Sequence, residues 1–168
     1  MCIRDRFLGI CFGMQLAILE SISNIQGYKN ASSTEFGKTS IPVISMIHEW
    51  IKNKKIVKHD SKNLGGSMRL GSYTSILLKG SKIYSIYKKN KINERHRHRY
   101  EVNYNYKKQI EKSGVVLSGM SPDGNLVEIM ERIDHPWFLG VQFHPELKST
   151  PFKPHPIFNS FIKALLIK

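Results

Sequence analysis

The feature that most constrains this sequence is a short apolar run, Phe7 to Ile10, that leads directly into a cysteine held between two glycines. The spacing Gly9-x-Cys11-x-Gly13 is that of a nucleophile elbow, in which a sharp turn from a strand into a helix lifts the nucleophile clear of a sheet. Glycines suit positions where neighbouring backbone passes close. Apolar residues then recur every three or four positions, which predicts a helix with one buried face. The members of that face are Met14, Ala17, Ile18, Ile22 and Ile25.

Cys11 therefore lies at the predicted N-terminus of a helix. The helix dipole and the free backbone N–H groups there favour a thiolate, which is the nucleophilic form of cysteine. A second interpretation is equally open at this stage, because free cysteines are commonly small buried apolar residues. The elbow by itself does not decide between the two.

A second apolar run, Gly140 to Phe143, ends in His144 and is followed two residues later by Glu146. A histidine with a nearby carboxylate suits a base and the group that orients it. A histidine beside a proline is often only a loop residue. Together with the elbow, however, the sequence offers Cys, His and Glu from two strand ends, which is the arrangement that acyl transfer requires.

With these two motifs the chain resembles the class I glutamine amidotransferases, whose Cys-His-Glu triad lies in GxCxG and FHPE motifs. Further segments resemble the glutaminase domain of the CTP synthase family, in order and from about residue 7 to the end of the chain. These segments are Ser33-Thr34-Glu35-Phe36, Gly65 to Gly71, Glu94 to Asn103 and His135-Pro136-Trp137-Phe138.

The resemblance implies a catalytic role for each triad residue. Cys11 would attack the side-chain carboxamide of L-glutamine, and His144 would remove the thiol proton and then protonate the leaving ammonia. Glu146 would orient His144, and water would hydrolyse the γ-glutamyl thioester. The backbone N–H of Phe12, the residue after the nucleophile, would hold part of the oxyanion.

The resemblance also implies a binding site for free glutamine. Gln15, one turn into the helix, would contact the substrate, and Glu35 would accept its α-ammonium group. Arg99 would hold its α-carboxylate, a task suited to the planar guanidinium fork. Without the resemblance, Glu35 reads as a solvated loop residue.

The segment from Glu94 to Asn103 is the most highly charged of the chain, and in isolation it would suggest a phosphate or RNA patch. Strand-like alternation instead places its arginines on one face and its histidines on the other. The arginines other than Arg99 are predicted to line a face toward a partner domain.

The charge balance bears on possible partners. The chain has 26 Lys and Arg against 13 Asp and Glu, a formal net charge of +13, which could attract nucleic acid, a membrane surface or a nucleotide. The lysines are scattered through Lys/Asn/Ile-rich stretches, so we interpret most of them as solvated surface and expect neither a nucleic-acid nor a membrane partner. No apolar run reaches the roughly 20 residues of a membrane span. The two cysteines do not make a disulfide framework, which favours the cytoplasm.

The alternation of strand-like and helix-like segments predicts an α/β fold with a central, largely parallel sheet. The resemblance makes this the flavodoxin-like three-layer sheet of the class I glutamine amidotransferases. Further strands are expected at 41–47, 73–78 and 137–143, a hairpin at 115–120 and 126–133, and helices at 104–112 and 157–167. Residues 48–64 read as a polar surface connection. Residues 65–71 read as a turn with Arg69 at its tip, where Arg69 would be an internal salt-bridge partner and not a catalytic residue.

The domain organisation follows from the extent of the resemblance. Residues 1–6, including Cys2, lie outside it and are assigned no function. Residues 7–168 are expected to be a partial glutaminase domain that lacks its first strands and a glycine-rich loop carrying a second oxyanion donor. The synthase domain is expected to be absent as well, so that the chain would be the C-terminal part of a longer protein.

The cofactors and partners are expected to be those of the family. The chain has no G-x-x-x-x-G-K-[S/T] phosphate loop. We therefore assign ATP, Mg²⁺ and UTP to the synthase domain of the parent polypeptide, and no cofactor or metal to this chain. By the resemblance, L-glutamine is the substrate, ammonia passes to the synthase domain, and the full-length enzyme is a homo-oligomer.

Two alternatives remain open. A γ-glutamyl hydrolase or cysteine peptidase of related fold would use the same triad, but Glu35 with Arg99 suits the two charged ends of a free amino acid. A non-catalytic basic module, for example one that binds RNA, would explain the charge but not the presence of Cys11, His144 and Glu146 together.

Overall fold

Six strands form the main sheet of the protein in the order β1-β11-β10-β9-β6-β7, in a computed structural model that describes residues 6–46, 51–52, 55–56 and 68–166. A smaller sheet has the order β2-β3-β8, and β4 with β5 forms a two-stranded antiparallel sheet. The strand bounds are β1 (Phe7–Ile10), β2 (Ala31–Ser33), β3 (Ile41–Met46), β4 (Ile51–Lys52), β5 (Lys55–Ile56), β6 (Arg69–Leu77), β7 (Lys91–His98), β8 (Tyr100–Val102), β9 (Val115–Met120), β10 (Val127–Arg132) and β11 (Phe138–Val141).

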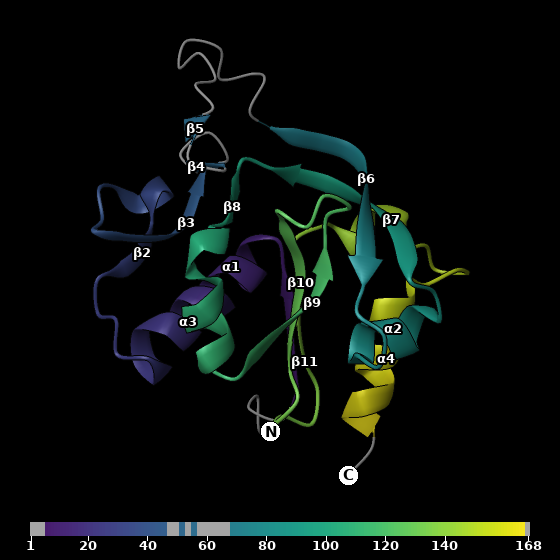
Figure 1. The fold of residues 1–168 in the computed structure, drawn as a ribbon. Helices are drawn as coiled ribbons and strands as arrows, with labels where there is room; N and C mark the ends of the chain where they lie inside the picture. Colours follow the sequence, from purple (N-terminus) through teal and green to yellow (C-terminus); the bar gives the residue numbers. More distant parts are fainter. Residues whose placement is uncertain (1–5, 47–50, 53–54, 57–67, 167–168) are drawn as a thin grey trace.

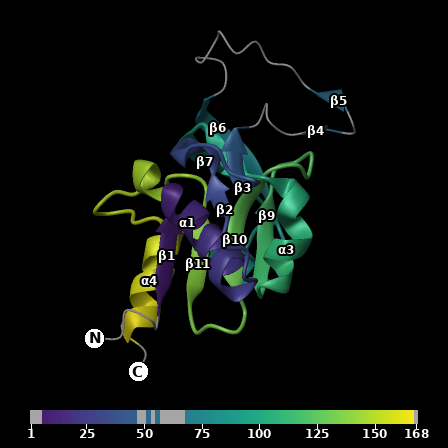
Figure 2. The same cartoon turned by 90° about the vertical axis from the view of Figure 1, so that its left-hand side faces the viewer.

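Helices cover both faces of the main sheet. Figure 1 shows α1 and α3 on one side and α2 and α4 on the other, and Figure 2 gives the view at right angles. The three-layer α/β arrangement predicted from the sequence is therefore confirmed. The helical segments are α1 (Phe12–Glu20), the π-helical turn η2 (Ser21–Ile25), the 3₁₀ turn η3 (Thr34–Phe36), α2 (Lys82–Tyr87), the 3₁₀ turn η6 (Tyr104–Tyr106), α3 (Lys107–Lys112), the 3₁₀ turn η7 (Pro145–Lys148) and α4 (Pro156–Leu166).

The expectation of a largely parallel sheet is wrong for the described strands. In the main sheet only β1 and β11 pair in parallel, whereas β11–β10, β10–β9, β9–β6 and β6–β7 are antiparallel. Parallel neighbours need a long crossover connection, while antiparallel strands can be joined by tight turns. Short connections link β9 to β10, the predicted hairpin, and β10 to β11. The parallel pair of the main sheet joins segments from opposite ends of the chain, and in the smaller sheet β2 and β3 also pair in parallel.

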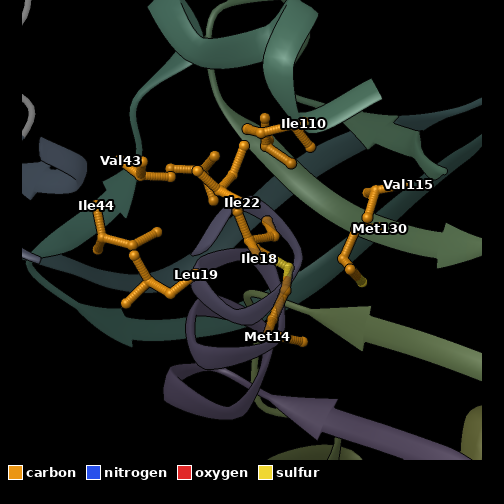
Figure 3. Packing of buried hydrophobic residues seen from close by; sticks show 12 residues of the cluster. Met14, Ile18, Leu19, Ile22, Val43, Ile44, Ile110, Val115 and Met130 are labelled. Carbon is orange, nitrogen blue, oxygen red and sulfur yellow. The ribbon is translucent and has the colours of Figure 1, made fainter. Parts of the chain in front are cut away.

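The buried face of α1 packs against the sheet and against β3 and α3 in one hydrophobic cluster, seen in Figure 3. Met14, Ile18 and Ile22 are completely buried, as the sequence periodicity predicts. Ile25 is an exception, because its side chain is 55% exposed. The helix widens into a π turn over its last five residues, which changes the angular spacing of side chains and rotates Ile25 away from the core.

A second hydrophobic cluster lies on the other face of the sheet, beneath α2 and α4. Ile83 of α2 and Ile157 of α4 are completely buried there, together with Val141 of β11. The predicted amphipathic helix at 157–167 corresponds to α4. Among the described residues, no helix is long and apolar enough to cross a membrane.

Several local predictions can be compared with the structure. The strand predicted at 41–47 is confirmed over residues 41–46, and residue 47 lies outside the described residues. The helix at 104–112 is confirmed as η6 followed by α3, and Gly114 beyond it has a positive φ of 85°. The predicted turn around Arg69 is wrong, because Arg69 is the first residue of β6 and is buried. Most of the predicted connection at 48–64, and Gly65 and Gly66, lie outside the described residues.

Candidate active site

The turn between β1 and α1 is a strained elbow centred on Cys11. Its φ of 52° and ψ of −104° are unusual for a residue with a side chain. A Cβ at Gly9 would lie 2.8 Å from the carbonyl carbon and oxygen of Gly13, so only glycine allows the first turn of the helix to approach the strand. A Cβ at Gly13 would meet no atom of the described residues within 4 Å. The first glycine of the motif is therefore required sterically and the second is not.

The parallel pairing of β1 with β11 brings the two sequence motifs together. Ile10 is in register with Val141, and the backbone N–H of Cys11 donates to the Val141 carbonyl over 2.7 Å. Parallel strands have their carboxyl ends at the same edge of a sheet, so Gln142 and His144 leave β11 beside the elbow. The backbone N–H of His144 donates to the Arg95 carbonyl over 2.8 Å, which ties this segment to β7.

His144 and Glu146 form a close pair. Nδ1 of His144 lies 2.6 Å from Oε1 of Glu146, and the glutamate side chain is 48% exposed. Because a carboxylate oxygen accepts hydrogen bonds, Nδ1 is the donor in this pair, and in the neutral form of the ring Nε2 has a free lone pair. Nε2 is buried and has no hydrogen-bond partner among the described residues. This geometry suits a base that is oriented by a carboxylate, as the sequence predicts.

The turn that carries Glu146 is anchored to β7. The Lys148 ammonium donates to the Asn93 carbonyl over 2.7 Å and lies 3.1 Å from Oε2 of Glu94. Burial opposes ionisation of Glu94, but its contacts with His155 and Lys148 outweigh burial and lower its pKa. The ionised Glu94 therefore holds Lys148, the last residue of this turn, and His155, which follows it.

The electrostatics of Cys11 differ from the sequence expectation. Burial raises the pKa of the Cys11 thiol, and the carboxylates of Glu101 and Glu146 act in the same direction. The backbone N–H of Phe12 and the side-chain amide of Gln142 lower this pKa, but by less than the other effects raise it. The helix N-terminus therefore does not by itself produce a thiolate, because the thiol is partly removed from water. A base is needed to ionise it.

Gln15 is buried and faces the inside of the site. Its Nε2 donates to the Tyr100 carbonyl over 2.8 Å and to Oε1 of Gln142 over 3.1 Å. Any contact of Gln15 with a substrate would therefore come from its Oε1. Gln142 in turn donates to the Cys11 sulfur over 3.7 Å. Sequence reasoning missed Gln142, although its position between β11 and His144 was a signal.

The predicted substrate residues Glu35 and Arg99 lie on turns. Glu35 is exposed in η3, and the ring of Phe36 beside it meets the ring of Phe12 edge-on at 5.9 Å, so this turn lies against the elbow. Arg99 is half-buried in the bend between β7 and β8, next to Tyr100, whose carbonyl binds Gln15. Their roles toward glutamine stay predictions.

The alternation predicted for the basic segment is confirmed in β7. Arg95 and Arg97 are exposed, while His96 and His98 are 1% and 7% exposed. Inside the sheet, burial and the neighbouring Arg69 lower the pKa of His96 to about 2 and that of His98 to about 3, so both rings are neutral. The histidines belong to the core and not to a phosphate-binding face.

Arg69 is an internal salt-bridge partner, as its sequence context allowed. Its guanidinium lies 3.0 Å from Oε1 of Glu101 and 2.8 Å from Oε1 of Glu128, and both carboxylates have no exposed surface. Burial raises the pKa of Glu101 to about 8 despite the arginine. We call Arg69, His96, His98, Glu101 and Glu128 the buried charge cluster.

A hollow of about 910 Å³ lies beside β1 and α1 and is lined largely by their apolar residues. Cys11, His144 and Glu146 do not line it, so it is not the site of the chemistry described above. Within the described ranges, no group of three or more His, Cys, Asp or Glu side chains is arranged to hold a metal ion.

Comparison with known proteins gives a consistent family. The sequence model for "Glutamine amidotransferase class-I" matches residues 4–164. The chain is 58% identical over 158 residues to CTP synthase from Pelagibacter ubique, and 57% identical over 159 residues to CTP synthase from Caulobacter sp.. Each match covers 94% of this chain and 29% of the relative, so the chain spans less than a third of the length of these curated relatives.

Solved structures agree with this comparison. The Trypanosoma brucei CTPS glutaminase domain with bound acivicin superimposes with a TM-score of 0.80 at 35% identity, covering 95% of this chain and 59% of that one. A GMP synthase protein from Thermoplasma acidophilum gives a TM-score of 0.54 at 19% identity, covering 95% of this chain and 56% of that one, which shows a shared fold only.

Proposed function

Because this chain belongs to the class I glutamine amidotransferases, we propose that it hydrolyses L-glutamine and supplies the ammonia with which a CTP synthase aminates UTP to CTP. The observation that carries the proposal is the edge formed by β1 and β11, where the elbow cysteine and the His144–Glu146 pair emerge together. The identity to CTP synthases over nearly the whole chain supports the choice among glutamine-dependent enzymes.

The proposed reaction begins with proton transfer. Nε2 of His144 takes the thiol proton of Cys11, and the sulfur attacks the carboxamide carbon of glutamine. The resulting oxyanion accepts a hydrogen bond from the backbone N–H of Phe12. His144 then gives its proton to the nitrogen, the C–N bond breaks, and ammonia leaves a γ-glutamyl thioester on Cys11.

Hydrolysis completes the cycle. His144 removes a proton from water, the oxygen attacks the thioester carbon, and the C–S bond breaks with its electron pair returning to sulfur. Glutamate is released and Cys11 regains its proton from His144. Throughout, Glu146 accepts the Nδ1 hydrogen bond and stabilises the imidazolium form of His144.

Specificity for free glutamine would come from two charged residues. In the proposal, Glu35 accepts the α-ammonium group and Arg99 binds the α-carboxylate with its planar fork. The contact between Phe36 and Phe12 supports this assignment, because it holds the turn carrying Glu35 against the elbow. A γ-glutamyl hydrolase or peptidase would not need both ends of a free amino acid to be recognised.

The partners of the proposed reaction lie outside this chain. Ammonia would pass to a synthase domain of the same polypeptide, which would use ATP and Mg²⁺ to activate UTP, and no residue of this chain is assigned to those ligands. We place the reaction in the cytoplasm and expect the whole enzyme to form a homo-oligomer. The exposed Arg95 and Arg97 would then face a partner domain.

The proposal can be tested in a chimera. This chain would replace the matching segment of the Pelagibacter ubique CTP synthase, and CTP formation would be measured with glutamine and separately with ammonia. We expect both activities, and Cys11→Ala should remove the glutamine-dependent activity while ammonia-dependent synthesis remains.

A second variant, Arg99→Ala, tests the proposed binding of the α-carboxylate in the same assays. An unpaired α-carboxylate in a closed site costs about 2–5 kcal/mol, so kcat/KM for glutamine should fall by roughly 30-fold to several thousand-fold. Ammonia-dependent synthesis should stay near wild type. A parallel fall of both activities would make Arg99 a folding or interface residue, and hydrolysis of γ-glutamyl peptides in preference to glutamine would favour the hydrolase alternative.

A further inference from the structure

We propose that Gln142 is a thiolate-stabilising residue of the site, because its side-chain N–H donates to the Cys11 sulfur. The Tyr100 carbonyl orients the side-chain amide of Gln15, and Gln15 in turn orients that of Gln142. The inference rests on the proposed function only in taking Cys11 as the nucleophile. It assigns a role in the reaction to a residue that lies outside the Cys-His-Glu triad.

The orientation of the two amides follows from a single acceptor. A backbone carbonyl cannot donate, so the group of Gln15 that lies 2.8 Å from the Tyr100 oxygen must be its NH₂. The same nitrogen lies 3.1 Å from the side chain of Gln142, and its second hydrogen requires an acceptor there. The atom of Gln142 that faces Gln15 is therefore its oxygen.

The nitrogen of Gln142 is then left on the side of the nucleophile, 3.7 Å from the Cys11 sulfur. If the amide were reversed, two NH₂ groups would face each other and an oxygen lone pair would face the sulfur. Gln142 has no exposed surface, so water could not compensate for either mismatch. Only one of the two orientations is compatible with the surrounding groups.

The Tyr100 carbonyl is itself held in place. Tyr100 begins β8 and pairs with Met46 of β3. Nδ1 of His98 also lies 3.1 Å from the Tyr100 oxygen, and since the ring is neutral, this contact assigns the proton to Nδ1. The carbonyl thus accepts from the two sides and cannot turn away from Gln15. The Tyr100 carbonyl therefore accepts hydrogen bonds from His98 of the buried charge cluster and from Gln15, which orients the residue in contact with Cys11.

The charge balance around the sulfur gives this hydrogen bond a function. Burial and the carboxylate of Glu146 in η7 disfavour a negative sulfur, and Glu101 in β8 adds to this effect above about pH 8, where it is ionised. His144 is the base that takes the proton, and the backbone N–H of Phe12 is the other donor acting on Cys11. The N–H of Gln142 would stabilise the sulfur when it becomes the attacking thiolate and again when the C–S bond of the thioester breaks and its electrons return to sulfur.

The test measures ionisation of Cys11 without using glutamine. The rate of alkylation by iodoacetamide would be followed against pH on the peptide containing Cys11, so that Cys2 is not counted. In Gln142→Met, which keeps the length of the side chain but has no donor, the midpoint of the profile should rise by about one pH unit, lowering the rate near neutral pH by about tenfold. Gln109→Met on α3, which packs against β9, is the matched control and should leave the midpoint unchanged.

A Gln142→Met profile identical to wild type in a folded protein would overturn the inference. Should that variant not fold, the wild-type protein decides, because the side-chain ¹⁵N–¹H signals of Gln142 must shift with the titration of Cys11. If these signals did not shift as Cys11 is titrated, the proposal would also be refuted. Absence of glutamine hydrolysis with the alkylation shift present would count against the proposed function and not against this inference.

Discussion

Two of the groupings of carboxylates with basic side chains in the described part of the protein differ in burial. At the carboxyl end of β11, Glu146 is about half exposed and holds the Nδ1 atom of His144. Between the strands, Glu101 and Glu128 share Arg69 with no exposed surface at all. Removing ions from water is costly, so a buried pair depends on every partner being present, whereas an exposed pair is individually weak. In the proposed reaction the same residue types therefore serve catalysis in one place, and they serve the stability of the fold in the other.

Removing the base should give the largest effect, and it should be confined to activity. His144→Ala should lower kcat for glutamine hydrolysis by about 10²–10⁴-fold, the usual contribution of general acid-base catalysis. Because its pairing with Glu146 is partly exposed, urea unfolding should change by less than about 1 kcal/mol. A large loss of stability would show that the exposed pair is structural after all.

Breaking the buried charge cluster, in contrast, should mainly lower the stability of the fold. Arg69→Met leaves the buried side chains of Glu101 and Glu128 without their cation and should reduce the free energy of unfolding by about 3–5 kcal/mol. Urea denaturation measures this directly. Lys79→Met, at an exposed position beyond β6, removes a cation without burial and serves as the control. Equal losses in the two variants would contradict the distinction drawn between buried and exposed charge.

Removing the orienting carboxylate should have an intermediate effect. Glu146→Gln keeps the shape of the side chain but loses the charge that holds His144, and a hydrogen bond to a charged group contributes about 1.5–3 kcal/mol. Steady-state kinetics should show kcat falling by roughly 10- to 150-fold. Thermal unfolding should not change. Full activity in this variant would mean that Glu146 has no role in orienting the histidine.

The smallest effect concerns pH. The folded protein retains a proton on Glu101 up to about pH 8, whereas the unfolded chain has lost it well below pH 7, so stability should fall as pH rises. Between pH 7 and 8 the loss should be at most about 1 kcal/mol, and it should level off above pH 8.

Between pH 7 and 8 the expected change in stability comes mainly from Glu101 and not from the buried histidines. The pKa values of His96 and His98 are lowered by folding, so the stability associated with them increases up to about pH 6.5 and is constant above it. Urea unfolding at pH 7.0, 7.5 and 8.0 should show the decline in wild type and in Glu146→Gln, and a smaller decline in Glu101→Gln, where burial still raises the pKa of Glu128. A decline of the same size in Glu101→Gln would assign the proton to another group.

The amino-acid sequence alone determined the local features of this protein. The elbow at Cys11, the pairing of His144 with Glu146 and the alternating faces of β7 depend on spacing along the chain, because helix and strand periodicities are short-range. For the same reason the buried positions of α1, and Ile22 just beyond it, were predictable, whereas Ile25 at the end of the π-helical turn was not.

Only the tertiary structure decided what depends on contacts between distant segments. The antiparallel order of the sheet, the burial of Arg69 between two carboxylates and the raised pKa of the Cys11 thiol arise from strands and side chains far apart in the sequence. Gln142 is the clearest case, since its amide is oriented through Gln15 by a carbonyl more than forty residues before it. Burial and hydrogen-bond polarity are properties of the assembled core, and sequence periodicity carries no information about which polar atoms will meet there.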